Sequence, residues 1–228
     1  MLDLYLTTER CNLCGWPLLR INRSAFGLRC VRCRSTHIHR ALGAVAEHLT
    51  LSPDQHVYEL STHGAWHRYV RARFPRATFS DYDPAVPSGR RIGGVLFQQV
   101  ETLSFPSAAF DVVSSTEVFE HVADDLAGFR QIHRVLRPGG FHIFTVPYDP
   151  DAPTRERAKL SATGQRIEHL PAEYHRNHRG QAVFTYRNYG NDLSRRQLEC
   201  GFASAVTYRV HTQRSIPAYV QLARKRYA

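Results

Sequence analysis

Four cysteines near the start of the chain have the spacing of a metal site. Cys11 and Cys14 form one CxxC pair, and Cys30 and Cys33 form a second pair after fifteen intervening residues. Each pair can place two thiolates on one side of a tight turn, and two such turns complete a tetrahedral four-sulfur site, as in zinc ribbons. Catalytic zinc usually keeps one position open for water, so four protein ligands indicate structural zinc. Two disulfides or four free thiols are the alternatives.

The start of the chain and its apolar runs indicate a reducing compartment. Residues 1–10 include Asp3 and Glu9 and lack the apolar core of a secretory signal peptide. No apolar run approaches about 18 residues, so we expect no membrane span. We therefore expect a cytoplasmic protein with reduced cysteines. His37 and His39 follow the last cysteines, but four thiolates already complete a site, so we interpret both as surface or docking residues.

A second group of residues that can do chemistry follows a strand–helix–strand pattern. Residues 110–114 form an apolar run closed by small polar residues, which is typical of a buried parallel strand. A helical segment comes next, and Pro138-Gly139-Gly140 predicts its end before a second apolar run at 141–147. Glu117 and His121 lie just after the first of these strands.

The sequence of this unit resembles the second half of the class I S-adenosylmethionine-dependent methyltransferases. The resemblance is carried by Phe-Asp-Val-Val at 110–113, Glu-His at 120–121 and Arg-Val-Leu-Arg-Pro-Gly-Gly at 134–140. It extends over most of the chain after residue 53. Together with the cysteine pairs, it makes the chain similar to a bacterial subgroup of these enzymes that carries an N-terminal zinc ribbon.

The resemblance implies an α/β fold, with a Rossmann-like, doubly wound, mostly parallel seven-stranded sheet and a small N-terminal zinc ribbon. We expect a zinc ribbon at 1–35, a connecting helix at 36–52, and a methyltransferase domain at 53–228 with a substrate or lid insert at about 148–187. Ligands in such sheets bind beyond the carboxyl ends of the strands. Strands are expected at 57–61, 77–80, 95–97, 110–114, 141–145, 206–210 and 219–223, the last one antiparallel to its neighbour.

The resemblance also implies that S-adenosylmethionine binds to the loops after the first four strands. Family members have an acidic residue followed by alternating glycines in the first loop. Glu59 matches the acidic residue, whereas Ser61, His63 and Ala65 stand where glycines are usual and Gly64 is out of step. The other expected cofactor contacts are Asp81 to the ribose, Gln99 to adenine, and Ser115 and Glu117 near the sulfonium. The alternatives are Asp83 for the ribose, an Asx turn before Pro84, and an exposed helix-start carboxylate at Glu117.

Histidines are candidates for the catalytic base. A hydroxyl nucleophile benefits from a base, and the ordinary pKa of histidine suits that role. We expect His121 and His175 to act here, although His121 has an equal alternative as a surface or sheet-capping residue. The insert supplies the substrate-side candidates Tyr148, Arg157, His169 and Tyr174. A metal cluster of His169, His175 and His178, or a plain solvated loop, is an alternative interpretation of the insert.

The charge of the chain leaves the class of acceptor open. The formal net charge is +10, but the cations are nearly all arginines scattered through the sequence, so we interpret them as a dispersed basic surface. We expect a small hydroxylated metabolite, a sugar intermediate or a natural-product precursor as the acceptor. The alternatives are an rRNA or tRNA methyltransferase, because some ribosomal RNA guanine methyltransferases join a ribbon to this fold, and a noncatalytic relative that binds nucleic acid or protein.

Overall fold

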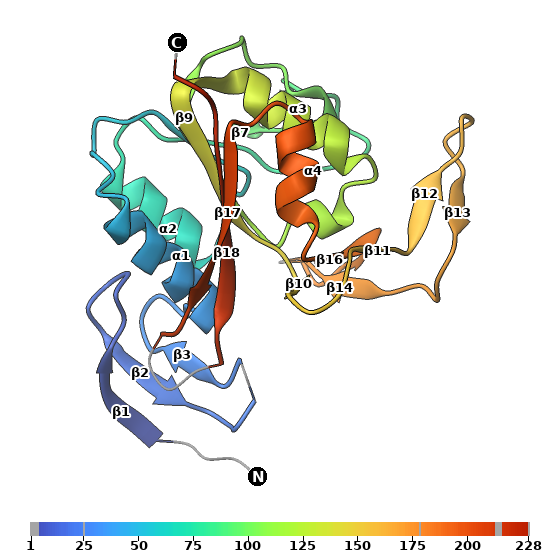
Figure 1. Ribbon diagram of the computed structural model, residues 1–228. Coiled ribbons are helices and arrows are strands. Elements are labelled where there is room, and N and C mark those ends of the chain that lie inside the picture. The colour runs from blue at the N-terminus through green and yellow to red at the C-terminus, as the bar shows by residue number, and fades with distance from the viewer. Residues whose placement is uncertain (1–4, 25, 178, 213–215, 228) are drawn as a thin grey trace.

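The computed structural model describes residues 5–24, 26–177, 179–212 and 216–227 (Figure 1). Its central element is a six-stranded sheet in the order β17-β18-β9-β8-β4-β5. These strands are β4 (Val57–Glu59), β5 (Thr78–Phe79), β8 (Phe110–Thr116), β9 (Leu136–Thr145), β17 (Ser204–Val210) and β18 (Ala218–Arg224). Helices cover both faces of the sheet. The expected doubly wound α/β fold is therefore confirmed.

Four strands of the sheet are parallel. β4 pairs with β5 and β8, and β8 pairs with β9, all in parallel. β18 is antiparallel to both β9 and β17, as expected for the last strand. The carboxyl ends of parallel strands share one edge of a sheet, so the loops after β4, β5, β8 and β9 meet there.

The expected third strand at 95–97 is reduced in the structure. β7 (Val95–Leu96) pairs antiparallel with β6 (Arg91–Ile92) in a short hairpin. Gly93 and Gly94 join the two strands and both have positive φ, the conformation that a two-residue hairpin turn needs. Phe97 then makes one isolated parallel bridge to Asp81 beside β5. Within the described residues, this bridge is all that fills the seventh position of the sheet.

The Pro-Gly-Gly segment lies inside β9 and does not form a turn ahead of it. β9 begins at Leu136, directly after the helix ends, so the strand is longer than the expected 141–145. A Cβ atom on Gly140 would lie 2.8 Å from the carbonyl oxygen of Asp111 in β8. Glycine therefore permits the close approach of β8 and β9 at this point.

The two faces of the sheet pack against different helices (Figure 1). α1 (His37–His48) and α2 (Gly64–Arg73) cover one face, and α3 (Asp125–Val135) and α4 (Leu193–Glu199) cover the other. Successive strand residues point to opposite faces, so Val112 packs with α1 and α2 while Val113 packs with α3. Across the described ranges, no helix has both the length and the apolar character that crossing a membrane requires.

The N-terminal ribbon is a small antiparallel sheet of three strands, β1 (Tyr5–Arg10), β2 (Pro17–Arg20) and β3 (Leu28–Cys30). Leu18, Leu28 and the cysteines form its core. The buried Arg40 of α1 donates hydrogen bonds to the carbonyl oxygens of Leu28 (3.3 Å) and Ser35 (2.9 Å). α1, which lies within the expected connecting segment 36–52, thus joins the ribbon to the main sheet.

The insert after β9 is built of short strands, so its interpretation as a solvated loop is wrong. β10 (Tyr148–Asp149) and β11 (Arg155–Glu156) flank β16 (Arg187–Gly190). β12 (Ala158–Leu160) pairs with β13 (Arg166–Glu168), and β14 (Tyr174–Arg176) pairs with β15 (Ala182–Phe184). Two single 3-10 turns complete the fold, η1 (Val100–Thr102) and η2 (Phe119–His121).

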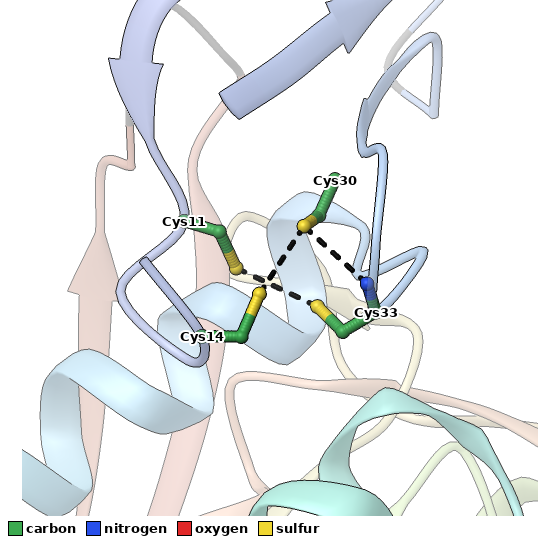
Figure 2. A group of neighbouring side chains, drawn as sticks. All are labelled: Cys11, Cys14, Cys30 and Cys33. Atoms are coloured by element: carbon green, nitrogen blue, oxygen red, sulfur yellow. Dashed lines mark hydrogen bonds between the residues drawn. The ribbon is translucent and has the colours of Figure 1, made fainter. Parts of the chain in front are cut away.

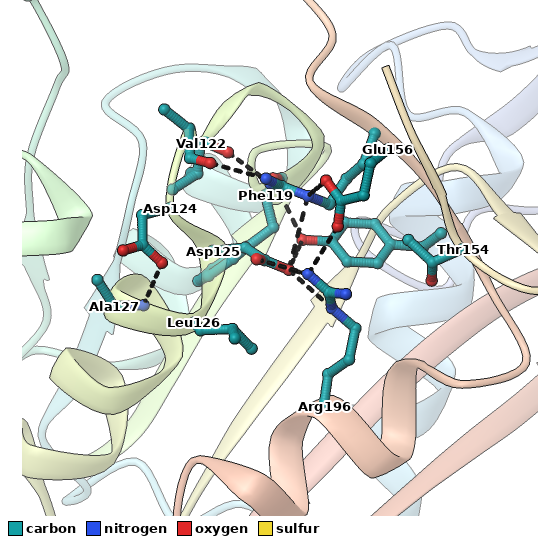
Figure 3. Close-up of polar contacts among 12 residues, drawn as sticks. Phe119, Val122, Asp124, Asp125, Leu126, Ala127, Thr154, Glu156 and Arg196 are labelled. Carbon is teal, nitrogen blue, oxygen red and sulfur yellow. Dashed lines mark hydrogen bonds and ion pairs between the residues drawn. The ribbon is translucent and has the colours of Figure 1, made fainter. Parts of the chain in front are cut away.

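A buried group of charged residues fixes the insert to α3 (Figure 3). Asp125 accepts hydrogen bonds from Tyr189 Oη (2.9 Å) and from Arg196 Nε (3.1 Å) and Nη2 (2.8 Å). Arg187 Nε lies 3.1 Å from Glu156 Oε2, and Arg196 also contacts Glu156. Arg187 further donates to the carbonyl oxygens of Phe119, Val122 and Ala123. Strands β11 and β16 are therefore anchored beside η2.

Candidate functional site

Acidic side chains follow three of the parallel strands at their shared edge. Glu59 ends β4, Asp81 comes shortly after β5, and Glu117 directly follows β8. Each was expected from the sequence to contact the cofactor. Because these strands are parallel neighbours, the structure places all three carboxyl groups at one edge of the sheet.

Glu59 is buried at the center of this edge. Its side chain is 1% exposed and accepts a hydrogen bond from Ser114 Oγ, whose oxygen in turn accepts one from Trp66 Nε1 (3.1 Å). Burial raises the pKa of the Glu59 carboxyl to about 8, and the hydrogen bonds only partly oppose this shift. The Glu59 carboxyl is therefore held in place by Ser114 of β8, which Trp66 of α2 supports in turn.

This buried carboxyl should make the stability of the protein depend on pH. In the unfolded state, the Glu59 carboxyl loses its proton above its ordinary pKa of 4.5, whereas in the folded state it keeps the proton up to a pH of about 8. The free energy of unfolding therefore falls as the pH rises from 4.5 to about 8. The slope for one group is at most about 1.4 kcal/mol per pH unit. We expect the free energy of unfolding, measured with urea between pH 5.5 and 8, to fall less steeply with pH for Glu59→Gln than for the wild type. Equal slopes in the two proteins would contradict this account.

The first loop adopts its shape without the glycines that are usual there. Gly64 has φ +89, and it starts α2, whereas Ser61 and His63 have ordinary negative φ. Ser61 Oγ accepts a hydrogen bond from the backbone N–H of His63 (3.2 Å) and lies 3.1 Å from its Nδ1. Gly64 is thus the left-handed position of this loop, although it is out of step with the glycines usual in the family. Ser61 and His63, which stand at usual glycine positions, therefore cause no backbone strain.

Asp81 already has a cationic partner in the insert. Its Oδ2 accepts hydrogen bonds from Arg179 Nη2 (2.8 Å) and Thr62 Oγ1 (3.4 Å), and its Oδ1 accepts one from the N–H of Tyr82 (2.8 Å). The Asx turn that was an alternative for this segment is formed by Asp83, which accepts from the N–H of Ala85 at 2.9 Å. The ribose contact of Asp81 therefore stays a prediction.

Gln99 and Ser115 occupy the remaining expected cofactor positions. Gln99 precedes η1, and its backbone N–H donates a hydrogen bond to Ser88 Oγ at 2.7 Å. The half-buried side-chain amide takes no part in that hydrogen bond and is available for other contacts. Ser115 lies within β8, and its buried Oγ has no hydrogen-bond partner among the described residues. Both side chains thus have polar atoms that a ligand at this edge can use.

Glu117 is not the exposed helix-start carboxylate that was its alternative interpretation. It follows β8 in the left-handed conformation, with φ +52, and its side chain is half-buried. Burial, and then repulsion by the nearby carboxyl of Glu120, raise the pKa of Glu117 to about 8. A residue with a side chain in this backbone region is uncommon and often marks a functional site.

His121 and His175 come together although they are far apart in the sequence. Their ring centroids are 5.0 Å apart, and both rings face the fully buried carboxyl of Glu120. His121 belongs to η2 after β8, and His175 belongs to β14 of the insert. The structure thus joins the two expected catalytic histidines into one cluster with Glu120, in which the His121 side chain is partly exposed.

The other expected substrate-side residues have different surroundings. Arg157 forms an ion pair with Glu173 and donates to Asn188 Oδ1 (2.6 Å), so it organizes the insert from within. Tyr148 packs against Tyr219, Tyr174 is half exposed beside Phe184, and His169 is exposed. None of these four belongs to the cluster of Glu120, His121 and His175. The alternative cluster of His169, His175 and His178 includes a residue outside the described part of the chain.

Two residues of this site, Glu120 and Arg179, were not predicted from the sequence. Glu120 had only its place in the Glu-His pair as a signal, and its complete burial depends on how the insert covers η2. Arg179 lies near the tip of a hairpin, and nothing in its local sequence indicates contact with Asp81. Both contacts depend on packing between distant segments, which a local pattern does not report.

The four N-terminal cysteines form a compact cluster (Figure 2). The Sγ atoms of Cys11 and Cys33 are 3.6 Å apart, and those of Cys14 and Cys30 are 3.4 Å apart. These distances exclude disulfides between the paired atoms, because a disulfide bond is about 2.05 Å long. Four sulfur atoms bound to zinc at about 2.3 Å would be about 3.8 Å apart, close to the observed spacing. The donor set and its geometry therefore fit a tetrahedral zinc ion.

Neither nearby histidine belongs to this cysteine cluster. His37 is buried and packs against Phe26, which agrees with a docking position and not with a surface one. His39 Nδ1 accepts a hydrogen bond from the N–H of Thr36 (3.2 Å) and completes the cap of α1. Burial lowers the pKa of His39 to about 4, so the ring is neutral and suited to this acceptor role.

Comparisons with known proteins agree with this geometry. A family model described as a methyltransferase domain matches residues 61–200 of the chain. A ubiquinone biosynthesis O-methyltransferase of Ruegeria pomeroyi is 49% identical over 43 residues, which are 19% of this chain and 17% of that protein. That match thus spans only a small part of the relative.

Solved structures share the fold at low sequence identity. The 1,6-didemethyltoxoflavin-N1-methyltransferase of Burkholderia thailandensis, solved with 1,6-didemethyltoxoflavin and S-adenosylhomocysteine, is 20% identical and has a TM-score of 0.52; the match covers 83% of this chain and 78% of that chain. The (4+2)-cyclase SpnF is 15% identical with a TM-score of 0.51, over 83% of this chain and 81% of that chain. At these identities the similarity concerns the fold alone.

Proposed function

We propose that this chain, which belongs to the S-adenosylmethionine-dependent methyltransferases, methylates a hydroxyl oxygen of a small molecule. The observation that carries the proposal is the cluster of Glu120, His121 and His175 beside the cofactor edge. An oxygen nucleophile must lose a proton during the transfer, and these side chains supply the groups that promote this loss. The acceptor classes that we propose are a hydroxylated metabolite, a sugar intermediate and a natural-product precursor.

The cofactor is proposed to lie along the carboxyl edge of the sheet. Asp81 accepts hydrogen bonds from the ribose hydroxyls, and Gln99 contacts adenine. The first loop approaches the amino-acid portion of the cofactor, and the end of β8 approaches the sulfonium. The residues proposed for these last two contacts are Glu59, Ser61, His63, Gly64, Ser115 and Glu117. The negative φ of Ser61 and His63 supports this assignment, since the loop keeps its shape without more glycines.

The insert is proposed to form the acceptor side of the site. Its hairpin β14–β15 brings His175 to η2 and Arg179 to Asp81. Tyr148, Arg157, His169 and Tyr174 are the residues that we propose to line or support the acceptor pocket. A small acceptor is favoured by the relative from Ruegeria pomeroyi, whose name assigns it O-methylation in ubiquinone biosynthesis.

Methyl transfer is an in-line displacement, so positioning supplies much of the catalysis. The acceptor oxygen bonds to the methyl carbon while the carbon–sulfur bond breaks, and S-adenosylhomocysteine leaves. Binding both reactants at one edge of a rigid sheet aligns oxygen, methyl carbon and sulfur before reaction. The insert, whose Arg179 contacts Asp81, is proposed to shield this edge from water.

We also propose that Cys11, Cys14, Cys30 and Cys33 hold a structural zinc ion. Their sulfur atoms fit a tetrahedral site without an open position, and the ribbon has too small a core to fold without such support. A site of reduced thiolates agrees with a cytoplasmic location. The ribbon is thus proposed to stabilize the protein and to take no part in the chemistry.

Asp81→Ala is expected to weaken S-adenosylmethionine binding by at least about tenfold, because the ribose loses two hydrogen bonds to a charged acceptor. Titration calorimetry with S-adenosylmethionine and S-adenosylhomocysteine measures this directly. Arg179→Ala is the matched comparison, since it removes the partner of Asp81 and keeps the carboxylate. We expect Arg179→Ala to bind the cofactor at least as tightly as the wild type.

Two outcomes would contradict the proposed cofactor site. Wild-type protein that binds neither compound at millimolar concentration would show that the unusual first loop does not accept the cofactor, and a noncatalytic role would then be favoured. Unchanged affinity in Asp81→Ala would show that the ribose lies elsewhere.

A further inference from the structure

The buried carboxylate of Glu120 lies beside His121 and His175 but makes no hydrogen bond among the described residues. Glu120 is fully buried, and neither carboxylate oxygen has a hydrogen-bond partner in the described part of the chain. Its Oε1 lies 3.6 Å from His121 Nε2 and 3.6 Å from His175 Nδ1. These distances are too long for hydrogen bonds. A buried carboxylate therefore lies at ion-pair distance from two ring nitrogens but beyond hydrogen-bond distance of either. A buried carboxylate without hydrogen bonds is costly.

The second nitrogen of each ring is already engaged on the far side. His121 Nδ1 is 2.8 Å from the carbonyl oxygen of Phe184, and His175 Nε2 is 3.2 Å from Glu173 Oε1. An acceptor at those positions holds the ring proton there, so a neutral ring points a lone pair toward Glu120. Histidines that bind metals commonly donate their other N–H to a backbone carbonyl or a carboxylate in this way.

We infer that Glu120, His121 and His175 bind one divalent metal ion of the first transition series. Their candidate ligand atoms all lie within 4.8 Å of one another. Metal–ligand bonds of about 2.0–2.2 Å place neighbouring donors about 3–3.6 Å apart, so only a small contraction is needed. The inference rests on the proposed function, because the ion would act on the acceptor hydroxyl.

The donor set indicates the kind of ion and its use. Two imidazoles favour transition metals over Mg²⁺ or Ca²⁺, and one carboxylate with two imidazoles leaves coordination positions open. The open positions distinguish this site from the closed four-cysteine cluster, which has no place for a substrate.

The metal ion gives the cluster a defined part in methyl transfer. The acceptor hydroxyl would bind at an open position, where the ion favours loss of its proton to solvent water. The oxygen then forms its bond to the methyl carbon, and the electron pair of the breaking carbon–sulfur bond goes to sulfur. The products are the methyl ether and S-adenosylhomocysteine, and no oxidant or reductant takes part.

Titration of the zinc-replete protein with Mn²⁺ tests the inference without an acceptor. Electron paramagnetic resonance of free Mn²⁺ is expected to show one binding site per chain in the wild type. Glu120→Gln and His175→Gln are expected to weaken this binding at least tenfold. His211→Gln is the control, because His211 is an exposed histidine that lies outside the cluster and outside the insert; we expect it to bind Mn²⁺ as the wild type does.

Two results would overturn the metal site. One is a wild-type protein that takes up neither Mn²⁺ nor a second equivalent of Zn²⁺ at millimolar concentration. The other is equal affinity in the wild type, Glu120→Gln and His175→Gln. A second measurement needs no variant, since bound Mn²⁺ should broaden the ring resonances of His121 and His175 in the wild type, and unbroadened resonances at saturation would also overturn the inference.

Cofactor titration separates this inference from the proposed function. A protein that binds Mn²⁺ at the cluster but not S-adenosylmethionine would keep the metal site and refute the proposed cofactor site. A protein that binds S-adenosylmethionine but no metal would refute the metal site alone. S-adenosylmethionine binding by Glu120→Gln and His175→Gln also reports whether these variants remain folded.

Discussion

Cys30→Ser is expected to release zinc from the N-terminal ribbon and to unfold it. Cys30 Sγ lies 3.4 Å from Cys14 Sγ and accepts a hydrogen bond from the N–H of Cys33 (3.4 Å), so its thiolate is central to the cluster. Zinc contributes about 10–16 kcal/mol of binding free energy in zinc-finger peptides, and such small folds do not persist without it. Metal analysis should find less than one zinc ion per chain, and hydrogen exchange should accelerate across residues 5–35.

Cys200→Ser is the matched control for this change. Cys200 is also buried, but it packs between α4 and α3 and contacts the carbonyl oxygen of Leu126. We expect Cys200→Ser to keep a full equivalent of zinc and ordinary protection of the ribbon. A zinc-free ribbon that kept its protection in Cys30→Ser would contradict a structural role for the metal.

Asp125→Ala is expected to lower the free energy of unfolding by about 3–5 kcal/mol, because it leaves the buried Arg187 and the partly buried Arg196 without their shared carboxylate. Asp125 is 2% exposed and binds Arg196 with both oxygens while it also accepts from Tyr189 (Figure 3). Arg187 and Tyr189 belong to β16, so the insert should also lose its anchor on α3. Urea unfolding measures the first effect, and hydrogen exchange across residues 148–190 measures the second.

The neighbouring residue Asp124 provides the control. It caps α3 by accepting a hydrogen bond from the N–H of Ala127 (2.9 Å). Asp124→Ala should cost about 1 kcal/mol, the usual value for loss of a helix cap, and should leave protection of the insert unchanged. Equal losses in the two variants would show that the buried ion pairs do not hold the insert in place.

The anchoring of the insert has a consequence for the site. His175 and Arg179 belong to the hairpin β14–β15 and contact Glu120 and Asp81, and β16, which follows this hairpin in the chain, is fixed beside η2. The backbone N–H of Tyr186 also donates to the carbonyl oxygen of Glu120 (2.7 Å). The buried charges around Asp125 are therefore positioning groups, and their loss should disperse the cluster of Glu120, His121 and His175.

Much of the fold was predictable from the sequence because it depends on local periodicity. The apolar run at 110–114, closed by small polar residues, identified β8, and helical spacing identified α1. The expected third strand at 95–97 is reduced to one bridge because Gly93-Gly94 favours a hairpin over an extended strand. The insert at 148–187 gave no clear pattern, since strands of two or three residues are too short to show periodicity.

The sequence by itself determined the grouping of the four N-terminal cysteines, the parallel order of the sheet and the acidic residues at its carboxyl edge. These features follow from spacing along the chain, because a CxxC pair and the residue after a strand keep their neighbours in any arrangement of the domain. Only the tertiary structure decided that His175 faces Glu120 and His121, and that Arg179 pairs with Asp81. Those contacts depend on the docking of a distant hairpin. Ion pairs that join α3, β11, β16 and α4 direct this docking.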